Sequence, residues 1–373
     1  MKVLMIPTWY SGHGEVMSAG IFHYEQSMAL QEYCDTALYF PFDTTLAGGF
    51  MRDVENGLLT FRRKQSRLRV FKYMLYVMDF LKIRSRFAPD IIHAHVASEA
   101  GRIAVLLGRL FRIPVVITEH NPVELAGLDK ARNRKRCAIA YKNSSANVCV
   151  SHHSKQSFEA FFPNSNFCVI FNGIVDPSKV MFEKCQYAQE GFVNCCIVAA
   201  FYSRDIKGYQ YLLPAIKELA DEGMKIKLHI CGDGTYMEEY VQMAKNLGIE
   251  DYCIFYGHCN REKIYSIESQ MDFCISASVF ESAGVAVQEA MLLGKPLVVT
   301  KSGGANSLVT KDTAIVVDKE STSALVDGIH QMVGQLDDFD RDLIREYAYK
   351  NFEINQVSQR YMELYTEVLH EYR

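Results

Sequence analysis

The sequence predicts an α/β protein made of two doubly wound, Rossmann-like domains. Short apolar runs alternate with longer amphipathic stretches along the whole chain, and strand–helix–strand repetition of this kind is typical of doubly wound folds. Most runs are continuous rather than alternating, as expected for parallel strands that helices cover on both faces. The series occurs twice, and 373 residues are too many for one ordinary core, so we expect two domains.

Eleven strands follow from these runs. Six lie in the first half, at residues 2–7 (KVLMIP), 35–40, 90–95, 114–120, 146–151 and 167–173. Five lie in the second half, at residues 194–200, 225–232, 252–257, 272–278 and 296–300. Helical periodicity marks residues 208–223, 235–248 and 341–373.

The domain boundary is expected at FNGIVDPSKV, where an Asn-Gly turn followed by Asp-Pro interrupts regular structure. An N-terminal domain would then occupy residues 1–172 and a second domain residues 173–345. A C-terminal helix, 346–373, could cross back to the N-terminal domain. A ligand cleft is expected between the two domains.

The composition indicates a soluble globular protein, with 49% hydrophobic and 23% charged residues. Its eleven cysteines include no CxxC pair, so we expect reduced thiols in a cytoplasmic protein. We expect no signal peptide, and no apolar run approaches the roughly 20 residues of a spanning helix. Basic residues are in excess in residues 1–175 and acidic ones in the remainder, which suggests that the first half faces something anionic. No nucleic-acid partner is expected.

A glycine-rich turn, SGHGEVMSAG, follows the first strand. It lacks the third glycine of the dinucleotide fingerprint, because Met17 stands there. Gly20 could still let the backbone approach a phosphate at the carboxyl edge of the sheet. The alternative is a simple surface loop.

The stretch FESAGVAVQEAMLLGKP (280–296) carries two glutamates, Glu281 before an expected helix start and Glu289 within the helix. Amides of Gly284, Val285 and Ala286 would be free donors at that start and would favour an anion such as a diphosphate. Each glutamate beside it could accept hydrogen bonds from sugar hydroxyls, as a nucleotide sugar would provide. The alternative is a helix-start acid and a solvated helix residue.

This stretch resembles the donor domain of GT-B glycosyltransferases, specifically retaining family four (glycosyl transferases group 1) of the bacterial surface-polysaccharide type. ESAGVAVQEAMLLGKPLVVTKSGG (281–304) matches its signature, with Ala283 where Phe is common. Other segments that resemble the family are IPTWYSGHGEVMSAGIFHYEQSMAL (6–30), DIIHAHVASEAG (90–101), VCVSHHSKQSF (148–158), VIFNGIVD (169–176), AAFYSRDIKGYQYLLPAIKEL (199–219) and the run at 229–264. The resemblance spans nearly the whole chain.

The resemblance implies roles for individual residues. Glu289 would bind the ribose, Glu281 the transferred hexose and Lys207 the phosphates. The family commonly has an Arg five or six residues before this Lys. This chain has Tyr202 and Phe201 at those positions. Arg204 could substitute for it, or could form a surface ion pair.

Two further sets of residues follow from the same resemblance. His120, in TEHNP, aligns with the family His that reaches the donor sugar, although a lone His is more often structural. His95 would at most lie on the acceptor side. Backbone groups around Gly257 and His258 would hold a uracil or guanine base. We therefore expect no cofactor other than the UDP- or GDP-linked sugar substrate, no metal, and a reaction that retains the anomeric configuration.

Residues 62–86 carry nine Lys or Arg and one acid, Asp79. Apolar residues recur there at helical spacing, at Val70, Met74, Val77, Met78 and Leu81. Such a helix would suit an anionic membrane surface, where lipid-diphosphate-linked glycans are acceptors. The alternative is a helix that packs this stripe on the domain core.

The sequence therefore favours a hexosyltransferase that acts in surface polysaccharide biosynthesis, such as capsule or exopolysaccharide, from the cytoplasmic face of the membrane. Two alternatives stay open. One is a glycosyltransferase with a small soluble acceptor, and the other is a silent partner that only binds a nucleotide sugar.

Overall fold

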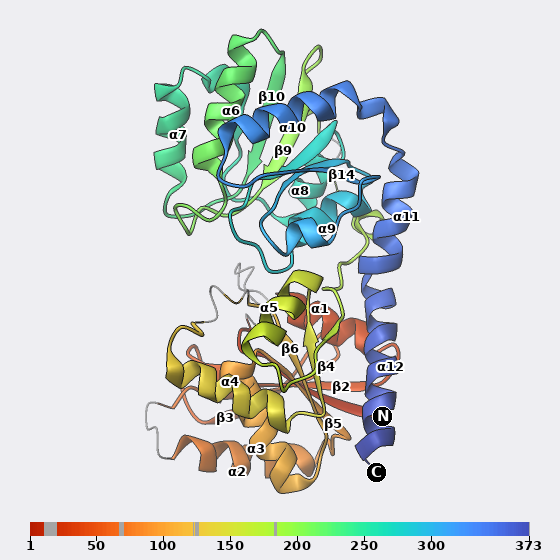
Figure 1. Cartoon of the computed structure of the whole chain (residues 1–373). Helices are drawn as coiled ribbons and strands as arrows, with labels where there is room; N and C mark the ends of the chain where they lie inside the picture. The colour runs from red at the N-terminus through yellow and green to blue at the C-terminus, as the bar shows by residue number, and fades with distance from the viewer. Residues whose placement is uncertain (11–20, 67–70, 122, 124–126, 183–184, 373) are drawn as a thin grey trace. The chain divides into compact units, whose positions relative to one another are not determined.

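The computed structural model describes residues 1–10, 21–66, 71–121, 123, 127–182 and 185–372. The chain divides into two compact units, one formed by Met1–Gly173 with Ile354–Arg373 and the other by Ile174–Glu353 (Figure 1). Each unit has its own largely parallel sheet and its own buried apolar core. The predicted doubly wound α/β class is confirmed.

The sheet of the first unit has eight strands in the order β3-β4-β2-β1-β5-β6-β7-β8. All neighbours pair in parallel except the antiparallel hairpin of β3 and β4. The strands are β1 (Lys2–Ile6), β2 (Asp35–Asp43), β3 (Phe50–Glu55), β4 (Leu58–Lys64), β5 (Ile91–His95), β6 (Val115–Glu119), β7 (Ala146–Cys149) and β8 (Cys168–Val169). Most side chains of the central strands are buried, which explains their continuous apolar sequences.

Helices cover both faces of this sheet. The core of one face joins sheet residues to α2 (Lys72–Arg84), α3 (Arg102–Phe111), α4 (Ala131–Asn143) and α5 (His152–Phe161). The core of the other face joins the sheet to α1 (Ile21–Leu30) and α12 (Ile354–Tyr372). A short π-helix, Ala97–Gly101, links β5 to α3.

The C-terminal helix α12 is an integral part of the first unit. Its residues Val357, Tyr361 and Tyr365 belong to the same buried cluster as residues of β1, β5, β6 and β7. The Tyr365 hydroxyl lies 2.6 Å from Nδ1 of His93, and the Tyr361 hydroxyl lies 3.1 Å from Oγ1 of Thr118. The chain therefore returns after residue 353 to complete the first sheet's outer layer.

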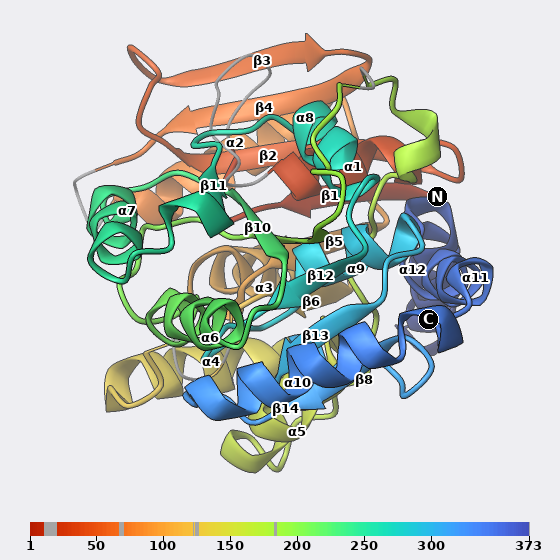
Figure 2. The same ribbon diagram turned by 90° about the horizontal axis from the view of Figure 1, so that it is seen from above.

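The sheet of the second unit is entirely parallel, in the order β11-β10-β9-β12-β13-β14. Its strands are β9 (Val193–Val198), β10 (Ile226–Cys231), β11 (Cys253–Phe255), β12 (Phe273–Ser276), β13 (Leu297–Thr300) and β14 (Ala314–Val317). Its helices are α6 (Tyr209–Asp221), α7 (Met237–Asn246), α8 (Arg261–Glu268), α9 (Val285–Leu292), α10 (Thr322–Gly334) and α11 (Arg341–Phe352). Helices α6 and α10 lie side by side along the sheet (Figure 2).

Three strands are missing from the sequence prediction. β3 and β4 are rich in charged residues, with the sequences FMRDVE and LLTFRRK. They meet at an Asn56-Gly57 turn in which both residues have positive φ, the geometry of a tight hairpin. Of the basic stretch 62–86, residues 62–64 end β4, and the helix expected from its apolar spacing is α2, which begins at Lys72. The third strand, β14, is only four residues long at the sheet edge.

Gly208 brings the loop after β9 against the end of β12. It has a φ of 75° and precedes α6, and a Cβ at this position would lie 1.9 Å from the carbonyl oxygen of Ala277. The Val279 amide donates to the Ile206 carbonyl across the same junction, at 2.7 Å. A side chain at residue 208 would push these two loops apart.

We expect Gly208→Ala to lower the free energy of unfolding of the second unit by about 2–5 kcal/mol. The positive φ costs an alanine about 1–2 kcal/mol, and the forced shift of a packed backbone costs about 1–3 kcal/mol. Urea unfolding monitored by circular dichroism measures the change.

The matched control is Gly223→Ala at the other end of α6. Gly223 has a φ of 87° but no atom within 4 Å of a built Cβ, so only the strain of about 1–2 kcal/mol remains. Equal losses in the two variants would contradict the close approach at Gly208.

Candidate functional site

The strand order of the second unit indicates where a ligand would bind. The chain builds outward from β9 through β10 to β11, then returns to the other side of β9 with β12 and continues to β14. In open parallel sheets, ligands bind beyond the carboxyl ends of the strands at the point where the order reverses. Here that point lies between β9 and β12.

The loops that follow these two strands bring Lys207 and Glu281 together. Nζ of Lys207 lies 2.7 Å from Oε2 of Glu281, and both side chains are partly exposed. The backbone of Glu281 is fixed on both sides, since its amide donates to the Ser302 carbonyl at 3.0 Å and its carbonyl accepts from the Gly304 amide at 2.7 Å. An exposed cation and an exposed acid therefore stand at the reversal point of the sheet.

Helix α9 begins beside this ion pair. Gly284 has a φ of 65°, Val285 is the first helical residue, and no side chain caps the helix. A Cβ on Gly284 would lie 3.0 Å from the Ala305 Cα, so the turn also packs closely on the next loop. The first-turn amides at Val285 and Ala286 are suited to an anion. The structure thus places these three predicted residues at a helix start next to Glu281.

Glu289 lies in the second turn of α9 and is nearly buried. The Tyr265 hydroxyl donates to its Oε1 at 3.1 Å, and Nε of Arg261 lies 3.5 Å from the same oxygen. Burial, with Glu289 beside the ring, raises the pKa of Tyr265, so its hydroxyl stays a donor. Tyr265 and Arg261, both from α8, were missed by the sequence analysis because neither belongs to a motif around Glu289.

The remaining predicted residues of this unit lie on other loops. Gly257 has a φ of 67° and its carbonyl accepts from the Gly232 amide at 3.1 Å, which joins the loops after β10 and β11. His258 is exposed next to it. Arg204 is 60% exposed and its Nε donates to Oε1 of Glu239 on α7 at 2.8 Å, which is the surface ion pair considered as the alternative.

The first unit holds His120 directly after β6, in a group of buried imidazoles. Its Nε2 lies 2.9 Å from Nδ1 of His95, the last residue of β5. Burial lowers the pKa of His120 and of His93 to about 3, so both rings are neutral. The sequence did not predict this contact, because nothing in it shows which side chains the ends of β5 and β6 bring together. Gly20 lies outside the described residues.

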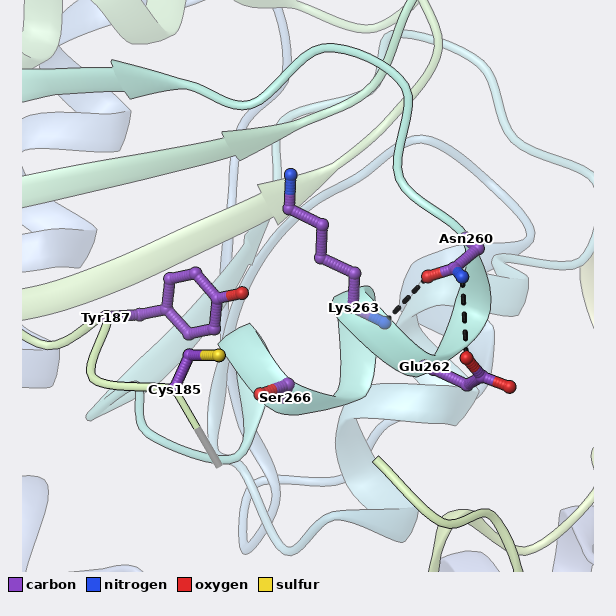
Figure 3. A pocket seen from close by; sticks show the side chains of 6 residues that line it. All are labelled: Cys185, Tyr187, Asn260, Glu262, Lys263 and Ser266. Atoms are coloured by element: carbon purple, nitrogen blue, oxygen red, sulfur yellow. Dashed lines mark hydrogen bonds between the residues drawn. The ribbon is translucent and has the colours of Figure 1, made fainter. Parts of the chain in front are cut away.

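A separate pocket of about 280 Å³ lies against α8 in the second unit (Figure 3). It is lined by Cys185, Tyr187, Asn260, Glu262, Lys263 and Ser266. None of these is a predicted site residue. The neighbouring α8 residues Arg261 and Tyr265 instead reach Glu289.

Two family models match the chain, one in each half. The model described as Glycosyltransferase Family 4 matches residues 46–176, and the model described as Glycosyl transferases group 1 matches residues 194–351. The second match contains Lys207, Glu281 and Glu289, and the first contains His120.

Similar proteins agree with these matches. N-acetyl-alpha-D-glucosaminyl L-malate synthase of Bacillus anthracis is 24% identical over 80% of this chain and 81% of that protein. Alpha-monoglucosyldiacylglycerol synthase of Streptococcus pneumoniae is 24% identical over 69% of this chain and 60% of that protein.

Solved structures share the whole architecture. Sucrose-phosphate synthase from Thermosynechococcus elongatus superposes with a TM-score of 0.77 at 15% identity, over 99% of both chains. Anabaena HepE in complex with UDP superposes with a TM-score of 0.76 at 19% identity, over 98% of this chain and all of that one. The chain therefore has the GT-B fold of the family 4 and group 1 glycosyltransferases.

Proposed function

We propose that this protein is a retaining hexosyltransferase that uses a nucleotide-diphosphate sugar and acts in surface polysaccharide biosynthesis. The observation that carries the proposal is the Lys207–Glu281 pair at 2.7 Å beside the uncapped start of α9, where the parallel sheet reverses its order. A cation, free helix amides and a carboxylate then stand within one crevice.

The donor would span this crevice. Its diphosphate would take the amides at Val285 and Ala286 and the ammonium of Lys207, because both favour negative charge. Glu281 would then exchange Lys207 for hydroxyls of the hexose. Glu289 would accept from the ribose hydroxyls, with Tyr265 and Arg261 orienting its carboxylate.

The base would lie against the backbone around Gly257 and His258. Gly257 adopts a positive φ, a conformation that glycine takes readily and that lets the backbone approach a ligand closely. Backbone contacts of this kind suit either UDP or GDP donors. His120 of the first unit would reach the donor sugar.

The proposed reaction needs no metal ion. The charge that develops on the leaving diphosphate would be stabilised by Lys207 and the α9 amides, and the same diphosphate would help to remove the acceptor's proton on the front face of the sugar. Nuclear magnetic resonance of the product identifies its anomer. An inverted linkage would refute the retaining mechanism.

The proposed acceptor is a glycan or a lipid-linked glycan. A small soluble acceptor is the second candidate, favoured by the similarity to a synthase named for L-malate. Incubating the protein with UDP- and GDP-sugars and each acceptor class separates the two. A protein that shifts its melting temperature with a donor, yet neither hydrolyses nor transfers it, would instead be a silent binding partner.

The outer face of α2 supports peripheral attachment to an anionic membrane, at the cytoplasmic surface. Met74, Met78 and Leu81 are 53%, 47% and 53% exposed, whereas Tyr76, Phe80 and Ile83 of the same helix are buried. Of the rest of the stripe predicted from the sequence, Val77 packs against the core and Val70 lies outside the described residues. Among the described residues, no helix has the length and apolar character needed to cross a membrane.

Cations surround this apolar face. Helices α2, α3 and α4 together carry ten Lys or Arg residues and one acid, Asp79. Asp79 is buried and paired with Arg63, so it does not offset the exposed positive charge. A surface with apolar side chains among cations matches the headgroup region of an anionic bilayer.

We expect Lys207→Met to reduce kcat by about 10²–10³-fold, comparable to the loss of one transition-state donor. Glu281→Gln keeps the size of the side chain but weakens a charged hydrogen bond of about 1.5–3 kcal/mol, so kcat/KM should fall by about 10–100-fold. Steady-state kinetics with the preferred donor measure both effects.

Lys301→Met is the matched control for Lys207→Met. Lys301 also forms an ion pair, with Asp318 at 2.6 Å, but it is well exposed and follows β13. Its substitution should leave kcat within about twofold of the wild-type value. Unchanged turnover in Glu281→Gln would refute the proposed role of this carboxylate.

For the membrane, we expect the double variant Met78→Glu and Leu81→Glu to abolish flotation with vesicles of anionic phospholipid at moderate salt. The added acids would repel the anionic headgroups, and the helix would lose the apolar side chains that enter the bilayer. Leu343→Glu, on α11 in the second unit and 47% exposed, should float like the wild type. Wild-type protein that stays at the bottom of the gradient would reject the attachment.

A further inference from the structure

Three histidines from distant parts of the sequence meet inside the first unit. His23 lies on α1, His95 ends β5, and His120 follows β6. Their exposed fractions are 1%, 0% and 9%. The parallel order of the sheet places the ends of β5 and β6 side by side, and α1 lies over them with His23 against both rings.

The ring nitrogens lie at distances that one ion can bridge. One nitrogen from each histidine lies within 4.8 Å of the other two. The ring centroids of His23 are 4.2 Å from those of His95 and 5.1 Å from those of His120. Around a tetrahedral zinc ion with Zn–N bonds of about 2.0–2.1 Å, ligand nitrogens are separated by about 3.3–3.4 Å. The observed separations, 2.9 Å between His95 and His120 and at most 4.8 Å among all three, bracket that value.

Several of these nitrogens lack a partner among the described residues. Both ring nitrogens of His23 and Nε2 of His95 are buried there without a hydrogen bond. The adjacent His93 differs, because its two nitrogens contact the hydroxyls of Tyr365 and Thr118 at 2.6 and 2.8 Å. A buried polar atom without a partner costs about 1–3 kcal/mol, so within the described part of the chain these nitrogens can still accept a ligand.

We propose that His23, His95 and His120 form a binding site for one divalent transition-metal ion of the zinc type. Neutral imidazole nitrogens are common ligands of such ions. An ion between the rings would replace the hydrogen bond between His95 and His120 and would also use a nitrogen of His23. Three protein ligands leave a fourth position for water.

The site would tie α1 to the ends of β5 and β6. It shares His120 with the proposed transfer reaction, which itself needs no metal, so the test of the site uses metal binding and not turnover. The other buried group of possible ligands is weaker, since Sγ of Cys196 and Sγ of Cys274 already contact each other at 3.4 Å.

The test uses the full chain, purified without a histidine tag, stripped with a chelator and then dialysed with Zn²⁺ or Co²⁺. Mass spectrometry of the bound metal should find about one ion per chain, and the Co²⁺ form should show the visible absorption of a four-coordinate site. Zn²⁺ should raise the melting temperature of the stripped protein, because the ion binds the folded state. None of these three measurements needs a sugar donor or an acceptor.

His23→Leu removes one ligand and replaces the imidazole with an apolar side chain of similar size. We expect its bound metal to fall at least about tenfold, because two ligands remain, while its circular dichroism spectrum stays that of a folded protein. His95→Gln serves as a second variant if His23→Leu does not fold. His330→Leu, which removes a half-exposed histidine paired with Glu222 of the second unit, should keep the full stoichiometry. Wild-type protein without stoichiometric metal, or equal binding by His23→Leu, would overturn the site.

Discussion

The ion pair between Lys207 and Glu281 depends on how two loops of the second unit are held at the reversal of strand order. The loop after β9 can approach the end of β12 because residue 208 has no side chain and takes a positive φ. The loop after β12 is fixed in turn by two backbone hydrogen bonds of Glu281 to the loop after β13. Three strand ends therefore set the position of two charges, and neither charge sits on a regular element.

A carboxylate at this place has a physical consequence. An acid beside a helix N-terminus without a cation would occupy the favourable site itself and would repel a bound diphosphate. Lys207 neutralises the charge of Glu281, so the pair adds no net charge at this place. The helix dipole of α9 then favours an anion. The same ammonium can turn to the phosphates while the carboxylate turns to hydroxyls.

The sequence predicts those elements and residue positions that depend on a continuous apolar run or on a fixed motif spacing. The continuous apolar strands, the start of a helix after Gly284 and the positions of Glu281 and Glu289 follow from neighbouring residues. The β3–β4 hairpin was missed because its strands carry charges and form no continuous apolar run, although its Asn-Gly turn is a known signal. Arg261, Tyr265 and the three-histidine group could not be predicted, since they meet their partners only through the packing of elements distant in sequence. The pairing of Arg204 with Glu239 could not be predicted either, because Glu239 reaches it only through the packing of α7.

The two units hold their polar groups by different means. In the second unit, Tyr265 and Arg261 contact Glu289, but close backbone turns fix the loops that carry Lys207 and Glu281. A Cβ on Gly208, Gly232 or Gly304 would lie within 2.2 Å of a carbonyl oxygen. Such a site tolerates little change of shape. In the first unit, side chains from separate elements do so, as in the contacts of His93 with Tyr365 and Thr118. Side chains can be exchanged without moving the backbone, so this unit is the part in which related chains can diverge.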